Sequence, residues 1–354
     1  MTTFLQLHLL TAYPPANLNR DDNGQPKTAV FGGTERLRIS SQSLKRAWRT
    51  SDVFASRLAG HIGARTQRIG KEVFDALVKK GADEKKATEI ARKIADLFGK
   101  TKDEKDANAL FTEQLAFIAP EERAKALTLA EKMLAGETKI ASDDVLVKED
   151  GAADIAMFGR MLADDPDFNR EAAVQVAHAI STHRVVLEDD YYTAVDDLGT
   201  DPGSSFIGVQ EFAAGVFYLY VCADLDLLVR NLNGDAALAK TAVGALIEAA
   251  ATVAPRGKQN SYASRALASF VMAEAGADQP RSLAAAFLKP VKSEDEDWAA
   301  LSAQTLLKFR EKLADAYGDA ATETCLMDAT GEKTEGTLKA VIAFAQSKVQ
   351  GAAP

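Results

Sequence analysis

The stretch that decides the fold runs from Arg36 to Arg49 and reads RLRISSQSLKRAWR. Its first four residues alternate charged and apolar side chains, as expected of a strand with one buried face. Ser40 or Ser41 can then cap a helix, because a serine hydroxyl accepts a hydrogen bond from a backbone N–H of the first turn. Leu44 and Trp48 are spaced i,i+4 and share the buried face of that helix. The stretch therefore predicts a short strand that leads directly into an amphipathic helix.

Cations gather in and just before this stretch. Positions 27 to 49 hold six cations and one acid, a local charge of +5 (6 − 1): Lys27, Arg36, Arg38, Lys45, Arg46 and Arg49 against Glu35. On the helix, Lys45 and Arg49 are i,i+4 neighbours, and Gln42 lies on the same face. Arg36 and Arg38 project from one face of the strand. Backbone N–H groups and serine hydroxyls at the helix start suit a phosphate. These features favour a phosphate-binding surface, and solvated surface charge is the alternative.

The chain as a whole is acidic, which confines any contact with nucleic acid to a local surface. Among 354 residues, 42 basic and 51 acidic side chains give a net charge of −9, so general stickiness toward polyanions is excluded. We expect no membrane-spanning segment and no signal peptide. Two cysteines, Cys222 and Cys325, are too few for a zinc pattern or a disulfide framework. A reducing cytoplasm is therefore the expected location.

The remaining pattern predicts a mixed α+β protein. Residues 3–10 are expected to form a strand with Leu5, Leu7 and Leu9 on one face, followed by a turn at Pro14-Pro15. Residues 64–136 are helical in pattern, with Pro120 opening one helix. Residues 215–221 form a strand candidate, and the flanks of 191–211 are expected to pair as a long hairpin. Further helices are expected at 173–180, 236–253, 298–317 and 336–347.

No catalytic arrangement stands out. His178 and His183 are five residues apart, which is typical of structural histidines rather than of a metal site. Pairs of adjacent aspartates are more often turn and cap residues than metal ligands. We expect no catalytic residue, no metal and no cofactor. A metal-dependent ribonuclease that uses Asp21 or Asp22 is the enzymatic alternative.

Several motifs closely resemble the CasC family, the crRNA-binding backbone subunit of the type I-E CRISPR Cascade complex. The motifs lie within residues 1–50 and 155–222 and read LNRDD (18–22), VFGG (30–33), RISSQSLKRA (38–47), GRM (159–161), AHAI (177–180), TAVDD (193–197), QEF (210–212) and GVFY (215–218). The resemblance implies a modified RRM, that is a ferredoxin-like palm, formed by residues 1–58 and 182–354. It also implies a helical fingers insertion at 59–181 and a β-hairpin thumb at about 189–222.

The resemblance further implies a non-catalytic subunit that polymerises head to tail along the crRNA. Its partners would be the crRNA, target DNA through the guide, further copies of itself and other Cascade subunits, with no membrane contact. The residues at backbone-contacting positions are Arg20, Lys27, Ser40, Gln42, Lys45 and Arg49, and those at base-displacing positions are Met161, Tyr192 and Thr193. We add Arg38 to the expected RNA-binding residues because of its charge. We also add Lys258, because the basic loop 255–259 resembles the family, though more loosely. A stand-alone single-stranded RNA-binding protein is the alternative within the same class.

Overall fold

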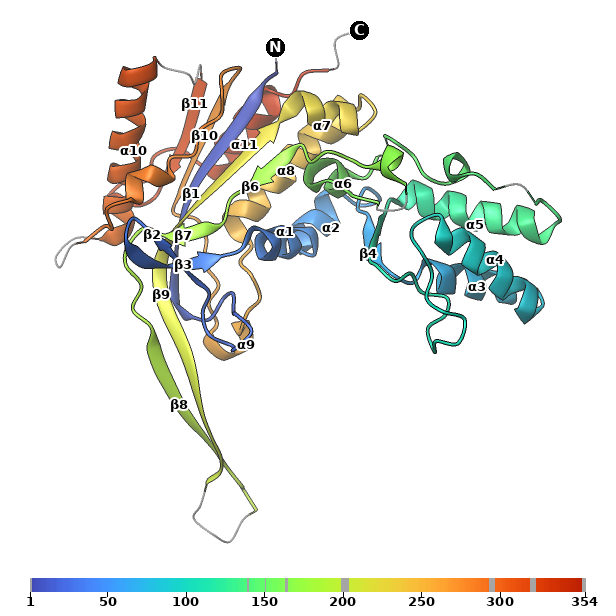
Figure 1. Ribbon diagram of the computed structural model, residues 1–354. Helices are drawn as coiled ribbons and strands as arrows, with labels where there is room; N and C mark the ends of the chain where they lie inside the picture. Colours follow the sequence, from blue (N-terminus) through green and yellow to red (C-terminus); the bar gives the residue numbers. More distant parts are fainter. Residues whose placement is uncertain are drawn as a thin grey trace. The chain divides into compact units, whose positions relative to one another are not determined.

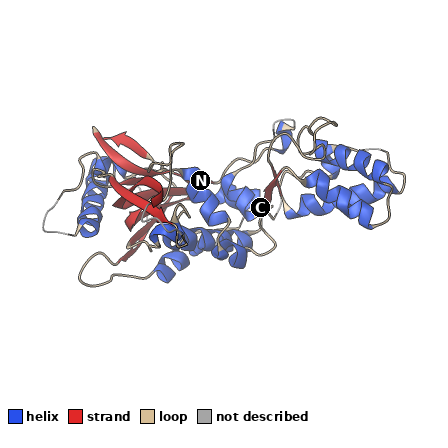
Figure 2. Ribbon diagram, turned by 90° about the horizontal axis from the view of Figure 1, so that it is seen from below, coloured by secondary structure: helices blue, strands red, loops and turns tan. Residues whose placement is uncertain are grey.

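The computed structural model describes residues 2–138, 140–149, 151–162, 165–198, 204–292, 297–318 and 323–351. By its internal contacts the chain divides into two compact units (Figures 1 and 2). The first, which we call the sheet unit, comprises residues 1–53, 175–223 and 243–348. The second, the helical unit, comprises residues 54–174, 224–242 and 349–354.

The sheet unit is built on an antiparallel sheet of nine strands, whose order in the sheet differs from their order along the chain. Its main path runs in the order β11 (Glu323–Asp328), β10 (Phe270–Gly276), β1 (Phe4–Ala16), β9 (Ser204–Asp224), β7 (Ala179–Ser181), β3 (Thr34–Ile39) and β2 (Thr28–Phe31). Two further strands, β6 (Val174–Val176) and β8 (Glu188–Val195), pair with β9. The predicted mixture of helices and strands is therefore confirmed, and the sheet is antiparallel.

The first strand differs from its prediction in both length and burial. Residues Leu5 to Leu10 are buried without interruption, so both faces of β1 are covered rather than one. The strand also continues through Pro14 and Pro15, where a turn was predicted. Proline lacks an N–H donor, which normally excludes it from a paired strand. The pairing of β1 with β10 ends at Leu10, opposite Phe270, so Pro14 and Pro15 lie beyond it and need not donate a hydrogen bond to β10.

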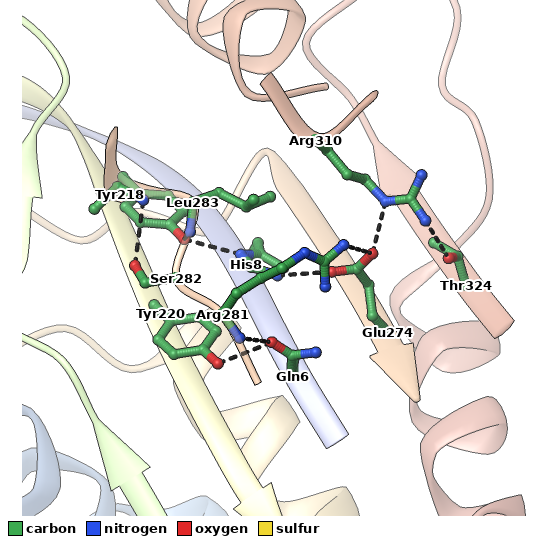
Figure 3. A network of polar contacts seen from close by, with 11 residues as sticks. Gln6, His8, Tyr218, Tyr220, Glu274, Arg281, Ser282, Leu283, Arg310 and Thr324 are labelled. Atoms are coloured by element: carbon green, nitrogen blue, oxygen red, sulfur yellow. Dashed lines mark hydrogen bonds and ion pairs between the residues drawn. The ribbon is translucent and has the colours of Figure 1, made fainter. Parts of the chain in front are cut away.

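A buried polar network occupies one face of the sheet (Figure 3). The Glu274 carboxylate on β10 accepts hydrogen bonds from His8 at 3.1 Å, Arg310 at 2.6 Å and Arg281 at 3.4 Å. Burial alone would raise the pKa of Glu274, but His8, Arg310 and Arg281 hold it at about 2. Burial lowers the pKa of His8, whose second ring nitrogen lies 2.8 Å from the Tyr218 hydroxyl. The carboxylate therefore stays charged inside the protein because two guanidinium groups compensate it.

Helices cover the sheet and supply the rest of its core. On the face of the polar network, α10 (Trp298–Tyr317) packs Ala299, Ala303 and Leu306 with sheet residues that include Leu10, Tyr218 and Met272. The helix α11 (Leu338–Ser347) contacts β10 and β11. The remaining elements of this region are α8 (Ala236–Thr252), α9 (Gln259–Tyr262) and the 3-10 turn Ala284–Phe287. The predicted helices at 236–253, 298–317 and 336–347 are confirmed within two residues.

A long two-stranded hairpin extends from the sheet (Figure 1). It consists of β8 and the first half of β9, paired in antiparallel register from Glu188↔Phe212 to Val195↔Ser204. The predicted pairing of the flanks of 191–211 is confirmed, while the connecting residues 199–203 lie outside the described ranges.

The helical unit has its own apolar core, to which α3 (Ile69–Lys79), α4 (Glu84–Asp96) and α5 (Pro120–Leu134) contribute Val73, Ile90, Ile94 and Leu129. Pro120 opens α5 as predicted. Two short strands, β4 (Ala64–Thr66) and β5 (Ala116–Ile118), pair within a region predicted as helical throughout. Its other elements are α2 (Asp52–Arg57), α6 (Ala153–Phe158), α7 (Leu225–Asn231) and 3-10 turns at Ser142–Asp144 and Pro166–Phe168. Within the described ranges, no helix is both long and apolar enough to cross a membrane.

One helix prediction was wrong because strand pairing overrode the local pattern, and one strand was missed. Residues 173–180, predicted as a helix, form β6 and β7 instead. β7 is held between β3 and β9 by the pairs Ile39↔Ala179 and Ile180↔Tyr218. β10 was not predicted, because it is buried on both faces and so lacks the alternation that marks a half-buried strand.

Candidate nucleic-acid interface

The predicted strand–helix unit is present and forms the centre of the candidate interface. The helix α1 (Ser41–Arg49) has Ser40 as its N-cap, with the Ser40 hydroxyl accepting a hydrogen bond from the Ser43 N–H at 3.3 Å. Leu44, Ala47 and Trp48 are buried beneath the helix. Ser40 itself is buried, so its hydroxyl primarily holds the helix start in place.

The outer face of α1 carries the predicted polar residues. Gln42 is exposed, and Lys45 and Arg49 are half-exposed. Their spacing of three and four residues places all three on one side of the helix. Arg46 is exposed on a neighbouring strip, and its carbonyl accepts a hydrogen bond from the Thr50 hydroxyl.

His178 lies at the start of α1, and sequence reasoning missed its position. Its Nδ1 atom accepts a hydrogen bond from the Ser41 N–H at 3.3 Å and lies 3.4 Å from Nη1 of Arg38. Burial and then the positive charges of Arg38 and Lys27 lower the pKa of His178. A histidine whose protonation is opposed by nearby cations reports a positive local potential. Cationic side chains therefore surround the start of α1, while the Ser41 N–H donor at that start is engaged by His178.

A network of backbone hydrogen bonds ties the loop before β2 to this helix start. Asn19 is the connecting residue: its carbonyl accepts from the Lys27 N–H and its side-chain oxygen accepts from the Ser40 N–H, both at 2.8 Å. The Lys27 carbonyl in turn accepts from the Arg38 N–H at 2.8 Å. Arg20 is exposed on the same loop, in a bridge with Pro26. The structure thus brings Arg20, Lys27, Arg38 and Ser40 into one hydrogen-bonded region.

Asp21 has a structural role in this loop. Asp21 Oδ1 accepts hydrogen bonds from the backbone N–H groups of Asn23 and Gln25, both at 2.9 Å, which closes the turn. In the described part of the chain, no group of three or more His, Cys, Asp or Glu side chains is placed to hold a metal ion.

Arg36 does not belong to the surface, contrary to its prediction as an outward-facing cation. Its side chain is fully buried and donates to the carbonyls of Ser181 at 3.0 Å and Phe287 at 2.7 Å. Burial lowers the pKa of Arg36. The surface cluster therefore contains one cation fewer than the local sequence charge indicated, because Arg36 connects β3 to β7 and to the 284–287 turn.

Lys258 lies on a loop that packs against the residues before Arg20. A Cβ atom added to Gly257 would lie 2.2 Å from the carbonyl oxygen of Leu18, so only glycine allows this approach. Lys258 adopts a left-handed backbone conformation, with φ of 49°, and precedes α9. The predicted basic loop is therefore held beside the Asn17–Leu18 segment.

The predicted hairpin residues are exposed. Tyr192 is 37 % exposed, and its ring contacts Phe206 with 5.9 Å between centroids. Its cross-strand partner is Gly208, where an added Cβ would lie 2.5 to 2.8 Å from the Tyr192 ring. Thr193 is exposed on the opposite face, paired with Ile207. Gly208 thus provides the flat surface on which the Tyr192 ring rests.

Met161 belongs to the helical unit, and its side chain is 82 % exposed. The preceding Arg160 forms an ion pair with Glu122 at 2.6 Å, and both side chains are fully buried. Arg160 also exchanges backbone hydrogen bonds with Arg170. Met161 borders a hollow of about 490 Å³ with Leu115, which is 61 % exposed and was not a predicted site residue. A mobile apolar side chain is therefore presented from a fixed backbone.

These features define a mixed α and β protein whose sheet unit gathers cations around one helix start. The family model described as CT1975-like protein matches residues 5–349, so the chain belongs to this family, which confirms the resemblance stated above. Two solved structures are similar over nearly the whole chain. One, titled "CRISPR RNA-guided surveillance complex, pre-nicking", is 33% identical with a TM-score of 0.85 and covers 98% of this chain and 100% of its own.

The second structure, titled "CRISPR RNA-guided surveillance complex", is 28% identical with a TM-score of 0.73. It covers 97% of this chain and 100% of its own. No curated protein matches the chain significantly. The chain is therefore similar, over 97% to 98% of its length, to chains of CRISPR RNA-guided surveillance complexes.

Proposed function

We propose that this chain is a non-catalytic backbone subunit of a Cascade complex of type I-E that holds the crRNA. The observation that carries the proposal is the similarity, over 98% of the chain, to a chain of a CRISPR RNA-guided surveillance complex, together with the cationic start and outer face of α1. Several copies polymerise head to tail along the guide, and target DNA is reached through base pairing with it. Other Cascade subunits are the further partners.

The strand order supports a ferredoxin-like palm. Numbered in chain order, β1, β7, β9 and β10 lie in the sheet as 4-1-3-2, the arrangement of a β-α-β-β-α-β unit. In this proposal residues 1–58 and 182–354 form the palm and about 189–222 the thumb. Because β6 and β7 pair within the palm sheet, they belong to the palm as well, and the fingers end before residue 174 rather than at 181.

The palm holds the RNA through its phosphates. Lys45 and Arg49 lie one helical turn apart, which suits successive phosphates of an extended strand. Gln42 adds a hydrogen-bond donor, and Arg20, Lys27 and Arg38 add charge. The N–H groups of Ser40, Ser41 and Ser43 already donate within the protein, so the start of α1 contributes mainly its position among these cations. Contacts of this kind carry no sequence information, so one subunit can hold any guide.

Met161, Tyr192 and Thr193 displace bases at intervals, with the thumb of one copy folded over the RNA on its neighbour. An aromatic side chain stacked on a base contributes about 1–3 kcal/mol whatever the base. The net charge of −9 fits this role, because a uniformly basic subunit would bind any cellular RNA.

The central test is the double change Lys45→Ala with Arg49→Ala. Affinity for oligouridine should fall about tenfold at moderate salt, and the slope of log K against log salt should decrease by about 1.4, since each lost contact to a single strand contributes about 0.7. Lys308→Ala with Lys312→Ala, two exposed cations four apart on α10, is the matched control. Equal affinities in all three proteins would contradict the proposal.

Two further measurements separate the alternatives. A discrete guide-sized RNA should co-purify with the chain when the other complex subunits are expressed, whereas a stand-alone RNA-binding protein would retain RNA of mixed length. Labelled RNA incubated with magnesium should remain intact. Cleavage that Asp22→Ala abolishes would favour the ribonuclease instead.

A further inference from the structure

The hairpin of β8 and β9 is held at its root, which we define as residues 188–190 and 210–212. Figure 1 shows the hairpin leaving the sheet as a two-stranded ribbon, with α9 beside the point where it starts. A ribbon of two strands is only marginally stable by itself and needs packing against other elements. The direction of the hairpin therefore depends on what its root contacts.

Tyr262 on α9 contacts both strands of the root. Its ring lies against Phe212 of β9, with 5.9 Å between centroids, and its hydroxyl donates to Oδ2 of Asp190 on β8 at 3.5 Å. The distance to Asp190 is at the limit for a hydrogen bond, so the ring contact is the stronger of the two. Burial and then the charge of Asp190 raise the pKa of Tyr262, so its hydroxyl remains a donor.

The loop before β2 holds the same root through β9. Asn17 Nδ2 donates to the Glu211 carbonyl at 3.0 Å, and Gln25 Nε2 donates to Glu211 Oε1 at 2.7 Å. The segment that leads into α9 is fixed to this loop in turn, because Gly257 leaves no room for a side chain beside the Leu18 carbonyl. The root, the loop and α9 are therefore joined by contacts on both strands of the hairpin.

A small change of angle at the root is amplified along the hairpin. Val195, the last paired residue of β8, lies seven residues beyond Glu188 (195 − 188 = 7), which is about 24 Å at 3.4 Å per residue. A rotation of roughly 10° would move that end by about 4 Å, comparable with the ~3.4 Å between successive nucleotides of one strand in a duplex. The root must therefore be held within a few degrees if the hairpin is to reach the same nucleotide on every neighbouring copy.

We propose that Tyr262 is a positioning residue that sets the angle of the hairpin and thereby the spacing of successive copies along the RNA. The inference rests on the proposed function, in which the hairpin of one copy folds over the RNA held by its neighbour. It assigns a role to a residue outside the set that contacts RNA. Phe212 is the surface against which Tyr262 acts.

Tyr262→Ala in the full chain tests the proposal on long oligouridine. Bound copies protect RNA from a non-specific ribonuclease, and the wild-type protein should leave fragments that lengthen by a constant increment per copy. In the variant the increments should vary by about one nucleotide or more. Affinity for a short oligouridine that accommodates one copy should be unchanged, because the cations of α1 are intact.

Two variants serve as controls. Tyr262→Phe keeps the ring contact with Phe212 and should restore the constant increment. Tyr317→Ala removes an exposed tyrosine on α10 and should behave as the wild type does. Phe212→Ala removes the other ring of the contact and should give the same varied increments as Tyr262→Ala, so it decides the question if thermal unfolding shows that Tyr262→Ala does not fold.

The outcomes separate this inference from the function on which it rests. Constant increments in the folded Tyr262→Ala protein, or in the folded Phe212→Ala protein in its place, would overturn the inference and leave the proposed function intact. A loss of affinity for the short oligouridine would also overturn it, because Tyr262 would then act on RNA binding within its own copy. If the wild-type protein protects no regular fragments, the proposed assembly along RNA fails and the inference fails with it.

Discussion

At the scale of single residues, Arg36 is a buried cation that stabilises the fold, in contrast to the exposed cations of α1. Its guanidinium donates hydrogen bonds to two backbone carbonyls from other segments, those of Ser181 and Phe287, and to the Thr34 hydroxyl. Arg36→Met should therefore lower the free energy of unfolding by about 2–4 kcal/mol, because the carbonyls of Ser181 and Phe287 lose their donor. Arg46→Met, on the exposed face of α1, should change it by less than about 0.5 kcal/mol. Urea unfolding measures both, and equal stabilities would contradict the structural role of Arg36.

A second residue-scale prediction concerns acid stability. The pKa of Glu274 is about 2 in the folded protein against an ordinary value of 4.5, so the folded state binds this proton less readily than the unfolded state. The contribution is complete above pH 4.5 and is lost as pH falls toward 2, and the shift corresponds to roughly 3 kcal/mol. The lowered pKa of His8 acts in the same direction below pH 6.5. Urea unfolding from pH 7 to pH 3 should show this decline.

Glu274→Gln provides the control for the acid measurement. The variant should be less stable than the wild type at pH 7, because Arg281 and Arg310 lose their charged partner. Its stability should then depend less on pH between 4.5 and 3. A wild-type profile that is as flat as that of the variant would show that Glu274 is not the titrating group.

At the scale of elements, secondary structure was predicted correctly where the local sequence pattern agrees with the contacts that the segment makes in the folded protein. The strand–helix unit at 36–49 was predicted with its cap and buried face, because Ser40, Leu44 and Trp48 have locally readable roles. The helical prediction for 173–180 failed because β3 and β9 determine the conformation of β7. His178 was dismissed as a structural histidine for the same reason, since only the sheet brings it to α1. Local spacing does not encode such contacts between distant segments.

The hairpin yields an element-scale prediction about Gly208. An added Cβ would overlap the Tyr192 ring, while the backbone of Gly208 is extended and accommodates alanine. Gly208→Ala should therefore displace Tyr192 and lower RNA affinity, up to the roughly tenfold or greater loss expected for Tyr192→Ala. In the Tyr192→Ala background the same change should have no further effect, which a double-mutant cycle measures. Additive losses would show that Gly208 acts independently of Tyr192.

At the scale of the whole molecule, the hairpin exposes more apolar surface than an isolated chain should. Large apolar side chains lie on both of its faces, with exposed fractions from 55 % to 69 %: Tyr191, Val195, Phe206, Ile207 and Val209. Contiguous exposed apolar surface of this kind marks an interaction site. A neighbouring copy that covers the hairpin agrees with the proposed head-to-tail assembly along RNA.

The corresponding prediction distinguishes assembly of several copies along RNA from RNA binding by a single copy. Tyr191→Ser with Val209→Ser changes a cross-strand pair on the face opposite Tyr192. The variant should bind a short oligouridine that accommodates one copy with unchanged affinity, because α1 and its cations are intact. On a long oligouridine it should fail to form the large species that the wild type forms, as measured by sedimentation velocity. Tyr317→Ser, which removes a tyrosine on α10 that is more exposed than Tyr191, should assemble normally. Full assembly of the hairpin variant would mean that neighbouring copies do not meet through this surface.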